Sequence, residues 1–458
     1  MSAVVQDLVH PSSARALLAG DPARLLAFGE GVAIDLATFE RQVRALAALL
    51  PDGDCAINLC EDRYRFMVAF CAATVRGQAT LLPPSRAAGV IAEALRRHPR
   101  SHCIGDGAQA AGLPRYWPMP ARLPEADGAP LQLQPDAIAA IGFTSGSTGT
   151  PSANPKTWAS FRTSTAQNLA ALRDFWPDGE CAHVVATVPP QHMYGMEMSV
   201  LLPLLGEAAV HTGRPFFAED IVRALREAPG NRLLVTTPVH LRALVEACAA
   251  DPRLAPPPLA GIVSATAPMP SELAAAAEDR FGCELRELFG STETCVIARR
   301  RSAREEAWTP YPGVRIQPQP DGSVVRAAHL AGPVALADVV ELLDDGRFLL
   351  RGRNADLLEI AGKRASLGDL TRKLQAIPGV EDGVVFQLER TGPGGVRRIA
   401  ALAVAPSLEP GDILSALRES IDPVFLPRPL RRVPGLPRDP TGKLPRAALL
   451  ALIGGTSH

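Results

Sequence analysis

The sequence predicts an α/β protein with a large N-terminal domain of layered sheets and helices and a small α+β C-terminal domain. Three observations favour this fold class. Short apolar runs alternate with helical patterns through most of the chain. From about residue 310, short runs are separated by Asp-Gly turns, and after residue 353 a new helix and strand pattern begins. We therefore expect one domain over residues 1–353 and a second over residues 354–458.

The elements expected in the first domain follow in chain order. Residues 34–50 form a helical pattern before a proline, with its apolar face at Leu36, Phe39, Val43, Leu46 and Leu50. The run 55–59 predicts a buried strand, and 63–77 predicts a helix that ends at Gly77. Further strands are expected at 182–188, 232–237 and 259–266, each followed by a helical pattern. Alternation of this kind is typical of a largely parallel sheet with helices packed on it.

The second half of the chain shows a different pattern. Strands are expected at 314–318, 323–328, 334–343 and 346–352, with hairpin turns at Asp321-Gly322 and Asp345-Gly346. The C-terminal domain then predicts helices at 366–377 and 412–421 and strands at 383–389 and 398–404.

Composition and charge exclude several function classes. The chain has 458 residues, 47% hydrophobic and 21% charged, with a formal net charge of −1. This balance is ordinary for a globular protein and offers no electrostatic footprint for nucleic acid or an acidic membrane. We find no apolar run long enough for a membrane span and no convincing signal peptide, and we expect a cytoplasmic protein.

Cysteine and lysine usage add two further expectations. The eight cysteines (residues 55, 60, 71, 103, 181, 248, 283 and 295) show no CxxC pair, so we expect reduced, mostly buried thiols and no structural zinc. Lysine occurs at only four positions, Lys156, Lys363, Lys373 and Lys443, because arginine supplies the other positive charges. A lysine in such a background indicates a task that needs a compact ammonium group. Lys156 and Lys443 are the candidates, since both lie beside loops rich in Gly, Ser or Thr.

The stretch Thr144–Gly149, "TSGSTG", follows the apolar run 137–143 and predicts a loop that holds phosphate. Glycines let backbone N–H groups converge and hydroxyls add donors. The common nucleotide-binding patterns do not fit: Pro155 rather than Gly precedes Lys156, and no GxGxxG opens a helix here. A flexible surface turn is the alternative for this loop taken alone.

Six motifs in order along the chain favour the phosphate-binding interpretation of this loop. They are "TSGSTGTP…K" (144–156), "PPQHMYG" (189–195), "LFGSTE" (288–293), "LAD" (336–338), "GRNADLLEIAGKRASLGDL" (352–370) and "LPRDPTGKLPR" (436–446). This set resembles the ATP-dependent acyl-adenylate-forming family, which includes acyl-CoA synthetases, aryl-CoA ligases, nonribosomal adenylation domains and luciferases. The segments "NLCEDRYRF" and "LLPPSR" are further similar to ligases of aryl-polyene or xanthomonadin-type pigment pathways.

The resemblance implies the fold, the reaction and its cofactors. It implies an acyl-adenylate-forming enzyme whose C-terminal domain is mobile and turns about a hinge near Ala355. An AMP-forming acid–thiol ligase would use ATP and Mg²⁺ to activate a carboxylic acid, and coenzyme A would accept the acyl group. The expected partner is a small carboxylic acid, with an acyl or aryl carrier protein as a further possibility. No nucleic acid or membrane is expected as a partner.

The resemblance also implies roles for residues on the ATP side of the site. Residues Thr144, Ser145, Gly146, Ser147, Thr148 and Gly149 would wrap the phosphates, with Lys156 nearby. Glu293 would be catalytic by holding Mg²⁺, a hard cation that prefers carboxylate oxygen. Taken alone, Glu293 is as well explained as an acid at a helix start capped by Ser291 or Thr292. Adenine would lie against Ala265, Thr266, Phe289, Gly290, Ser291 and Thr292, and Asp338 and Arg353 would hold the ribose.

Two further catalytic residues follow from the same resemblance. His192 would lie near the substrate carboxylate. Lys443 would reach from the C-terminal domain to the carboxylate and the α-phosphate, where the fork of an arginine is a poor replacement. Without the resemblance, His192, Phe289, Asp338 and Arg353 would be ordinary core or surface residues.

Three departures from the family pattern stand out. Lys156 follows Pro151 by five positions rather than directly, which leaves its role at the phosphates open. Ala355 occupies the hinge position that commonly carries Asp or Lys, and "LAD" keeps the acid of the usual "TGD" but loses the glycine.

The resemblance to pigment-pathway ligases implies an aryl acid such as a hydroxybenzoate as the substrate. A fatty or 3-hydroxy acid, and a carrier-protein phosphopantetheine thiol as the acceptor, stay open. A catalytically silent nucleotide-binding scaffold is the remote alternative, and the presence of Lys443 and Glu293 disfavours it. The particular acid and the oligomeric state cannot be derived from these motifs.

Overall fold

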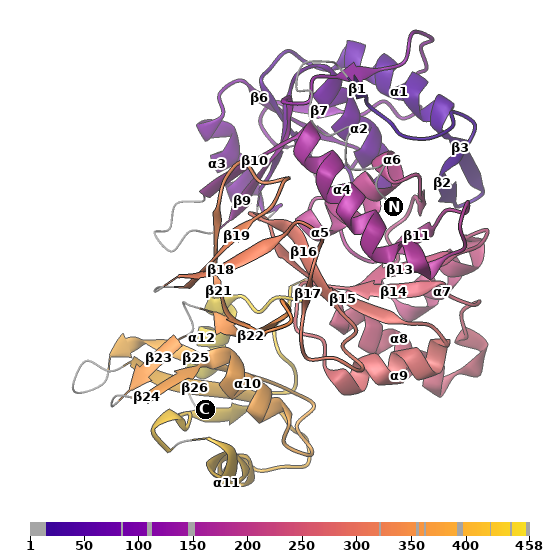
Figure 1. Cartoon of the computed structure of the whole chain (residues 1–458). Helices are drawn as coiled ribbons and strands as arrows, with labels where there is room; N and C mark the ends of the chain where they lie inside the picture. The colour runs from indigo at the N-terminus through magenta and orange to yellow at the C-terminus, as the bar shows by residue number, and fades with distance from the viewer. Residues whose placement is uncertain are drawn as a thin grey trace. The chain divides into compact units, whose positions relative to one another are not determined.

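The computed structural model describes residues 15–83, 86–107, 112–144, 152–319, 322–353, 357–360, 363–391, 397–421, 423–439 and 442–454. The chain forms two compact units (Figure 1). The first comprises Met1–Glu306, Tyr311–Val314 and Ala327–Gly332, and the second Ala307–Pro310, Arg315–Arg326 and Pro333–His458. Residues 333–353 thus group with the second unit, and the boundary expected at residue 353 stays a prediction. No helix in the described ranges is long and apolar enough to cross a membrane.

The first unit contains a mainly parallel sheet with the strand order β10-β9-β5-β4-β6-β7. These strands are β4 (Cys55–Asn58), β5 (Ala79–Leu82), β6 (Ser101–Gly105), β7 (Tyr116–Pro118), β9 (Ile138–Thr144) and β10 (Ser152–Thr157), of which β10 is antiparallel to β9. The associated helices are α1 (Leu36–Leu49), α2 (Arg63–Val75) and α3 (Ala88–Arg97). Asp35 and Asp62 cap α1 and α2 by accepting hydrogen bonds from the N–H groups of Thr38 and Arg65.

A second sheet of the same unit carries the strands that matter most for the site. Its order is β16-β15-β14-β13-β11-β12-β2-β3, parallel from β15 to β2 with antiparallel strands at both ends. The strands are β2 (Leu25–Gly29), β3 (Val32–Asp35), β11 (His183–Ala186), β12 (Ala209–His211), β13 (Arg232–Thr236), β14 (Gly261–Ser264), β15 (Leu285–Ser291) and β16 (Cys295–Arg300). Short strands β1 (Arg15–Ala16) and β8 (Gln132–Leu133) pair with each other.

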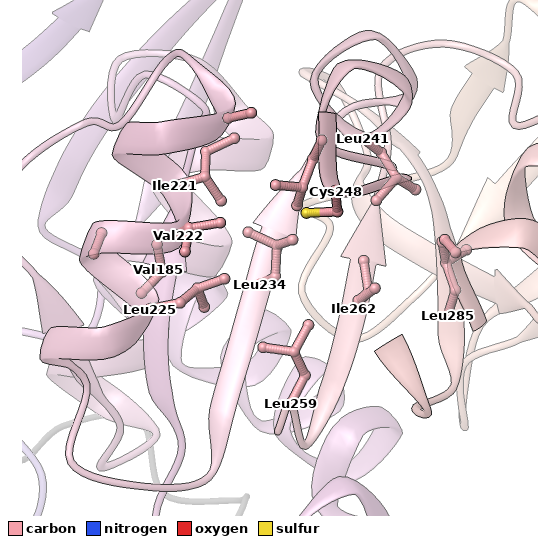
Figure 2. Close-up of a cluster of buried hydrophobic side chains, with 14 of the residues drawn as sticks. Val185, Ile221, Val222, Leu225, Leu234, Leu241, Cys248, Leu259, Ile262 and Leu285 are labelled. Carbon is pink, nitrogen blue, oxygen red and sulfur yellow. The ribbon is translucent and has the colours of Figure 1, made fainter. Parts of the chain in front are cut away.

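Helices α7 (Ala218–Glu227), α8 (Pro238–Ala250) and α9 (Ser271–Phe281) lie side by side against this second sheet (Figure 1). Figure 2 shows the core between them: Val185, Leu234, Ile262 and Leu285 from the strands meet Ile221, Val222, Leu225, Leu241 and Cys248 from the helices. A buried apolar core on this scale keeps the strands in register, which in turn fixes where each strand ends.

Two further helical segments belong to the first unit. One is α4 (Trp158–Leu172), and the other runs without a break through α5 (Met193–Met196), a π-helical turn (Glu197–Leu201) and α6 (Leu202–Leu205). Single-turn π segments occur often at functional sites, and Glu197 is the first residue of this one.

The second unit is built from small sheets. Its strands are β17 (Thr309–Pro310), β18 (Arg315–Gln319), β19 (Gly322–Arg326), β20 (Val334–Leu336), β21 (Asp338–Leu342), β22 (Phe348–Arg353), β23 (Leu357–Ile360), β24 (Lys363–Ser366), β25 (Asp382–Thr391), β26 (Arg397–Val404) and β27 (Leu430–Arg432). Its helices are α10 (Leu367–Gln375), α11 (Pro410–Ser420) and α12 (Arg446–Gly454). Strands β25, β26 and β27 share an apolar core with α10 and α11.

The structure confirms the α/β fold class and the expected elements, with shifts of a few residues at their ends. The strand expected over 334–343 is the one correction. It divides at Ala337 because Val334–Leu336 pairs with β19 whereas Asp338–Leu342 pairs with β22. All eight cysteines are free thiols; Cys181 and Cys283 are half-buried and the others are buried.

Candidate active site

Four strands of the second sheet end at one edge. Strands β11, β13, β14 and β15 are parallel and in register, with Ser264 of β14 opposite Thr236 of β13 and Glu287 of β15. The segments that leave their carboxyl ends include "PPQHMYG" after β11 and Ala265 and Thr266 after β14, and Phe289, Gly290 and Ser291 end β15 itself. In open α/β sheets ligands bind at this edge. The expected adenine residues and His192 therefore lie on the side where a ligand is expected.

Strand β9 leads into the expected phosphate loop. Thr144 is its last residue, and Ser145, Gly146, Ser147, Thr148 and Gly149 lie outside the described residues. Gly142, two residues before Thr144, packs tightly against two other motifs. A Cβ at Gly142 would lie 2.4 Å from Thr292 Cγ2 and 3.6 Å from Met193 Cε. The base of the phosphate loop, the "STE" turn and the start of α5 thus meet at one point.

Glu293 lies in a tight turn between β15 and β16. The turn is closed by the Thr294 hydroxyl, which accepts from the Ser291 N–H at 3.0 Å and lies 3.1 Å from the Ser291 hydroxyl. The alternative in which Glu293 begins a helix is therefore wrong, because the chain reverses into β16 instead. Glu293 is half-buried, and Thr292 beside it contacts Gly142.

The Lys156 side chain is buried behind this turn. Its register partner on β9 is Ala140, and its ammonium group donates a hydrogen bond to the backbone carbonyl oxygen of Glu293. From the sequence, Lys156 was expected near the phosphates, and whether it binds them was left open. The contact with Glu293 was not expected.

Two features mark the residues expected beside adenine. Thr266 has a φ of +80°, a backbone conformation that is strained for a β-branched residue and that often marks a functional loop. Glu287, two residues before Phe289, accepts from the N–H of Met269 at 3.1 Å and so ties the loop after β14 to β15. Burial raises the pKa of Glu287, against the opposing effect of Arg300 and of its other hydrogen-bond partners. Phe289 is half-buried and Ala265 is buried.

His192 is the residue before helix α5 and is half-buried. Its neighbours are anchored to two sheets: the Gln191 side-chain amide donates to the Cys60 carbonyl oxygen at 2.7 Å, and the Tyr194 hydroxyl donates to the Val263 carbonyl oxygen at 3.0 Å. The loop that carries His192 is therefore held at both sides.

Arg63 supports the same loop from beneath. Its guanidinium donates to the carbonyl oxygens of Ala186 and Val188 at 2.9 and 3.0 Å and contacts the Ser199 hydroxyl. Burial, helped by the charge of Arg214, lowers the pKa of Arg63 to about 9. A buried cation bound to strand-end carbonyls fixes the exit of β11.

The two expected ribose residues lie in the second unit. Asp338 of β21 and Arg353 of β22 are direct register partners in an antiparallel hairpin. Residues facing each other in this way lie within reach of one ligand group. Asp338 is half-buried.

Lys443, also in the second unit, is exposed in a tight turn. The Asp439 side chain accepts from the Lys443 N–H at 2.9 Å, and the Asp439 N–H donates to the Lys443 carbonyl oxygen at 2.8 Å. Arg438 anchors this turn by a bidentate ion pair with Asp382, with closest approach 2.8 Å. The turn thus presents an ammonium group on a fixed backbone.

The described residues suit a Mg²⁺ ion that is held partly by the substrate phosphates and water. They contain no group of three or more His, Cys, Asp or Glu side chains that could hold a metal by themselves. Mg²⁺ commonly uses one or two carboxylates together with substrate phosphates and water. A single half-buried carboxylate, Glu293, beside the strand that enters the phosphate loop fits that donor set.

Three contributors to the site were missed from the sequence: Gly142, Glu197 and Glu287. Glu197 stands inside the apolar run "GMEMSVLL", where a charge is unexpected, and that contrast was the available signal. Glu287 lies among other charged residues in "CELRELFG" and gave no such signal. Gly142 had none, because its neighbours Thr292 and Met193 are distant in the sequence.

Comparison with known proteins agrees with this geometry. Residues 61–320 match the family model described as AMP-binding enzyme. A 4-coumarate–CoA ligase of Rhodobacter capsulatus is 34% identical over 286 residues, which cover 61% of this chain and 67% of the ligase. Enterobactin synthase component F of Escherichia coli is 27% identical over 411 residues, covering 74% of this chain but only 31% of that protein.

Solved structures show the same fold. ATP-bound MatB from Rhodopseudomonas palustris superposes with a TM-score of 0.79 at 18% identity, covering 94% of this chain and 95% of MatB. o-Succinylbenzoate CoA synthetase (MenE) from Bacillus subtilis, in complex with the acyl-adenylate OSB-AMP, gives a TM-score of 0.77 at 18% identity and covers 93% of this chain and 95% of MenE.

Proposed function

Because the chain belongs to the family of AMP-binding enzymes and is an AMP-forming acid–thiol ligase of that family, we propose that it joins an aryl carboxylic acid to coenzyme A at the expense of ATP. The observation that carries this proposal is the packing of Gly142 against Thr292 and Met193. This packing brings β9, which leads into residues 144–149, together with the turn that holds Glu293 and the segment after His192. ATP and an acid could be held there together.

The chemistry needs those three segments side by side. The substrate carboxylate attacks the α-phosphorus, pyrophosphate leaves, and a thiol then attacks the acyl-adenylate and displaces AMP. An anion must approach a polyanion in the first step, so charge neutralisation and in-line positioning dominate catalysis. Residues 144–149 would bind the β- and γ-phosphates, and Glu293 would hold Mg²⁺, which supplies charge neutralisation when bound.

The remaining roles follow from position. Adenine would lie between the loop that holds Ala265 and Thr266 and the end of β15 at Phe289, Gly290, Ser291 and Thr292. The facing pair Asp338 and Arg353 suits a diol such as the ribose hydroxyls. His192 would lie next to the acid. Lys443, exposed on a fixed turn, would supply the mobile positive charge when the C-terminal domain, residues 354–458, closes on residues 1–353.

The substrate class rests on the relatives. The R. capsulatus protein is named for an aryl acid, 4-coumarate, which supports an aryl acid here. The segments 58–66 and 81–86, similar to ligases of aryl-polyene and xanthomonadin-type pathways, favour a hydroxybenzoate and a role in pigment biosynthesis. The free thiols fit a reducing compartment and a cytoplasmic location.

A carrier-protein thiol is the second candidate acceptor. The match over 74% of this chain to a component of enterobactin synthase supports it. The two acceptors differ in what they contact, because a carrier protein needs a docking surface whereas coenzyme A needs only a channel.

ATP–pyrophosphate exchange over a panel of acids tests the proposal. The panel holds 4-coumarate, 3- and 4-hydroxybenzoate, octanoate and 3-hydroxyoctanoate, each with the wild type and with Lys443→Ala. We expect exchange with the aryl acids and a loss of about 100-fold or more in Lys443→Ala, the size of effect seen when one charge-stabilising group is removed. AMP release with coenzyme A, compared with a phosphopantetheinylated carrier protein, then identifies the acceptor. Exchange with the aliphatic acids alone would contradict the aryl assignment.

A further inference from the structure

Three buried side chains hold the backbone of the turn that presents Glu293. Lys156 donates to the Glu293 carbonyl oxygen, and the Nε2 of His329 donates to the Thr294 carbonyl oxygen at 2.7 Å. The Glu197 carboxylate accepts from the Val296 N–H at 3.0 Å. Lys156, Glu197 and His329 are 5%, 1% and 4% exposed. Solvent therefore supplies none of these contacts.

Glu197 is held in place by hydrogen bonds from helix α4. Glu197 accepts hydrogen bonds from the hydroxyl of Ser164 at 2.5 Å and the side-chain amide of Asn168 at 3.1 Å, both on α4. Burial raises the pKa of Glu197, while these hydrogen bonds and the positive charge of Lys156 lower it. A buried carboxylate needs hydrogen-bond donors, and Ser164, Asn168 and the Val296 N–H supply them here.

The register of β9 and β10 separates Lys156 from the phosphate loop. Thr144, where the loop begins, faces Ser152, whereas Lys156 faces Ala140. That offset of four residues is about 13 Å along a strand. The ammonium group of Lys156 donates its hydrogen bond to the Glu293 carbonyl oxygen.

The turn needs such support because its backbone is strained. Cys295 has a φ of +58°, which is unfavourable for a residue with a side chain, and Gly290 lies so close to the Cys295 carbonyl oxygen that a Cβ there would be 2.1 Å from it. A peptide group is planar, so fixing the Glu293 carbonyl oxygen fixes the plane from which the Glu293 side chain leaves the turn.

We propose that Lys156 is a positioning residue: through the Glu293 carbonyl oxygen it orients the Glu293 carboxylate toward Mg²⁺ and does not bind phosphate. The inference rests on the proposed function, in which Glu293 holds Mg²⁺. It explains why a lysine is retained at this position in a chain that uses arginine almost everywhere else: the longer, planar arginine group would not fit a single buried carbonyl oxygen.

Binding of ATP at a series of Mg²⁺ concentrations, without any acid, tests the inference. Isothermal titration calorimetry on the full chain compares the wild type with Lys156→Met, which keeps the length of the side chain and removes the ammonium. Lys373→Met, the same change on helix α10, is the matched control. The double variant Lys156→Met with Glu197→Gln also removes the buried Glu197 carboxylate, whose pKa the charge of Lys156 lowers, and guards against a failure to fold.

We expect the Mg²⁺ concentration for half-maximal ATP binding to rise about tenfold in Lys156→Met and in the double variant, since a hydrogen bond to a charged group contributes enough for a tenfold change. ATP affinity in EDTA stays within about twofold of the wild type, because no phosphate contact is lost. Lys373→Met leaves both values unchanged.

Two results would overturn the inference. A tenfold loss of ATP affinity in EDTA with an unchanged Mg²⁺ midpoint would make Lys156 a phosphate ligand. A folded double variant with the wild-type Mg²⁺ midpoint would show that Lys156 does not orient Glu293. If the wild type itself bound no ATP at any Mg²⁺ concentration, the proposed function would fail, and that failure is seen without any variant.

Discussion

Glu287 is the buried charge whose removal gives the sharpest test of how the proposed adenine side of the site is held together. Its carboxylate is 3% exposed and accepts three hydrogen bonds: from the Met269 N–H at 3.1 Å, the Ser302 hydroxyl at 2.7 Å and the Arg300 guanidinium at 2.7 Å. Glu287→Gln keeps the volume of the side chain. It removes the charge and replaces one acceptor oxygen by an NH₂ group.

The expected cost follows from these contacts. A hydrogen bond to a charged group contributes about 1.5–3 kcal/mol and a neutral one about 1 kcal/mol. The new NH₂ group would face a donor, which leaves one buried group unpaired at a cost of about 1–3 kcal/mol. The carboxylate, however, loses hydration on burial, which is the cause of its raised pKa, and glutamine avoids part of that penalty. We expect a net destabilisation of about 2–3 kcal/mol, in line with breaking a buried polar network.

Urea unfolding followed by tryptophan fluorescence measures this change. Trp117, Trp158 and Trp176 lie in the first unit with Glu287, so the signal reports mainly on that unit. Asp220→Asn is the control, since its ion pair with Arg223 lies at the surface and such pairs contribute about 0–1 kcal/mol. ATP affinity in Glu287→Gln should fall as well, because Met269 lies on the loop that follows Ala265 and Thr266. Equal unfolding midpoints for the two variants would refute the argument that Glu287 anchors this loop.

Three other changes have definite expected outcomes. Gly142→Ala should lower the ATP–pyrophosphate exchange rate about tenfold or more, because its Cβ would meet Thr292 Cγ2 at 2.4 Å and small misplacements at a site are costly. Adding Thr292→Ser removes that methyl group and should restore the rate. A double variant that stays slow would contradict the steric explanation. Burial, helped by the charge of Arg115, lowers the pKa of His102 from 6.5 to about 4. Between those pH values the unfolded chain binds a proton that the folded chain does not, so stability falls as the pH drops from about 6.5 to 4. Urea midpoints at pH 7.5, 5.5 and 4.5 should therefore fall less steeply in His102→Gln, and parallel curves would count against this assignment. Lys443→Ala should keep the wild-type urea midpoint while losing exchange, since Lys443 is exposed; a lower midpoint would indicate a structural role instead.

The sequence by itself determined the fold class, most of the elements and the family. Helices and strands with apolar faces form where their periodicity allows burial, so α1, β4, α2, β11, β13 and β14 could be predicted from local pattern. The order of the six motifs indicated an AMP-forming acid–thiol ligase, and the roles of Glu293 and Lys443 that follow from the resemblance stay predictions.

Only the tertiary structure decided which of these residues act on one another. Whether Lys156 meets a phosphate or the Glu293 carbonyl oxygen depends on the register of β9 and β10, and register is set by pairing across the sheet. Glu197 is a single charge in an apolar run, and its partners, like those of Glu287, come from other elements of the fold. Burial and pairing of charges are long-range properties, since a carboxylate becomes a structural anchor only where the packed fold excludes water and supplies its donors.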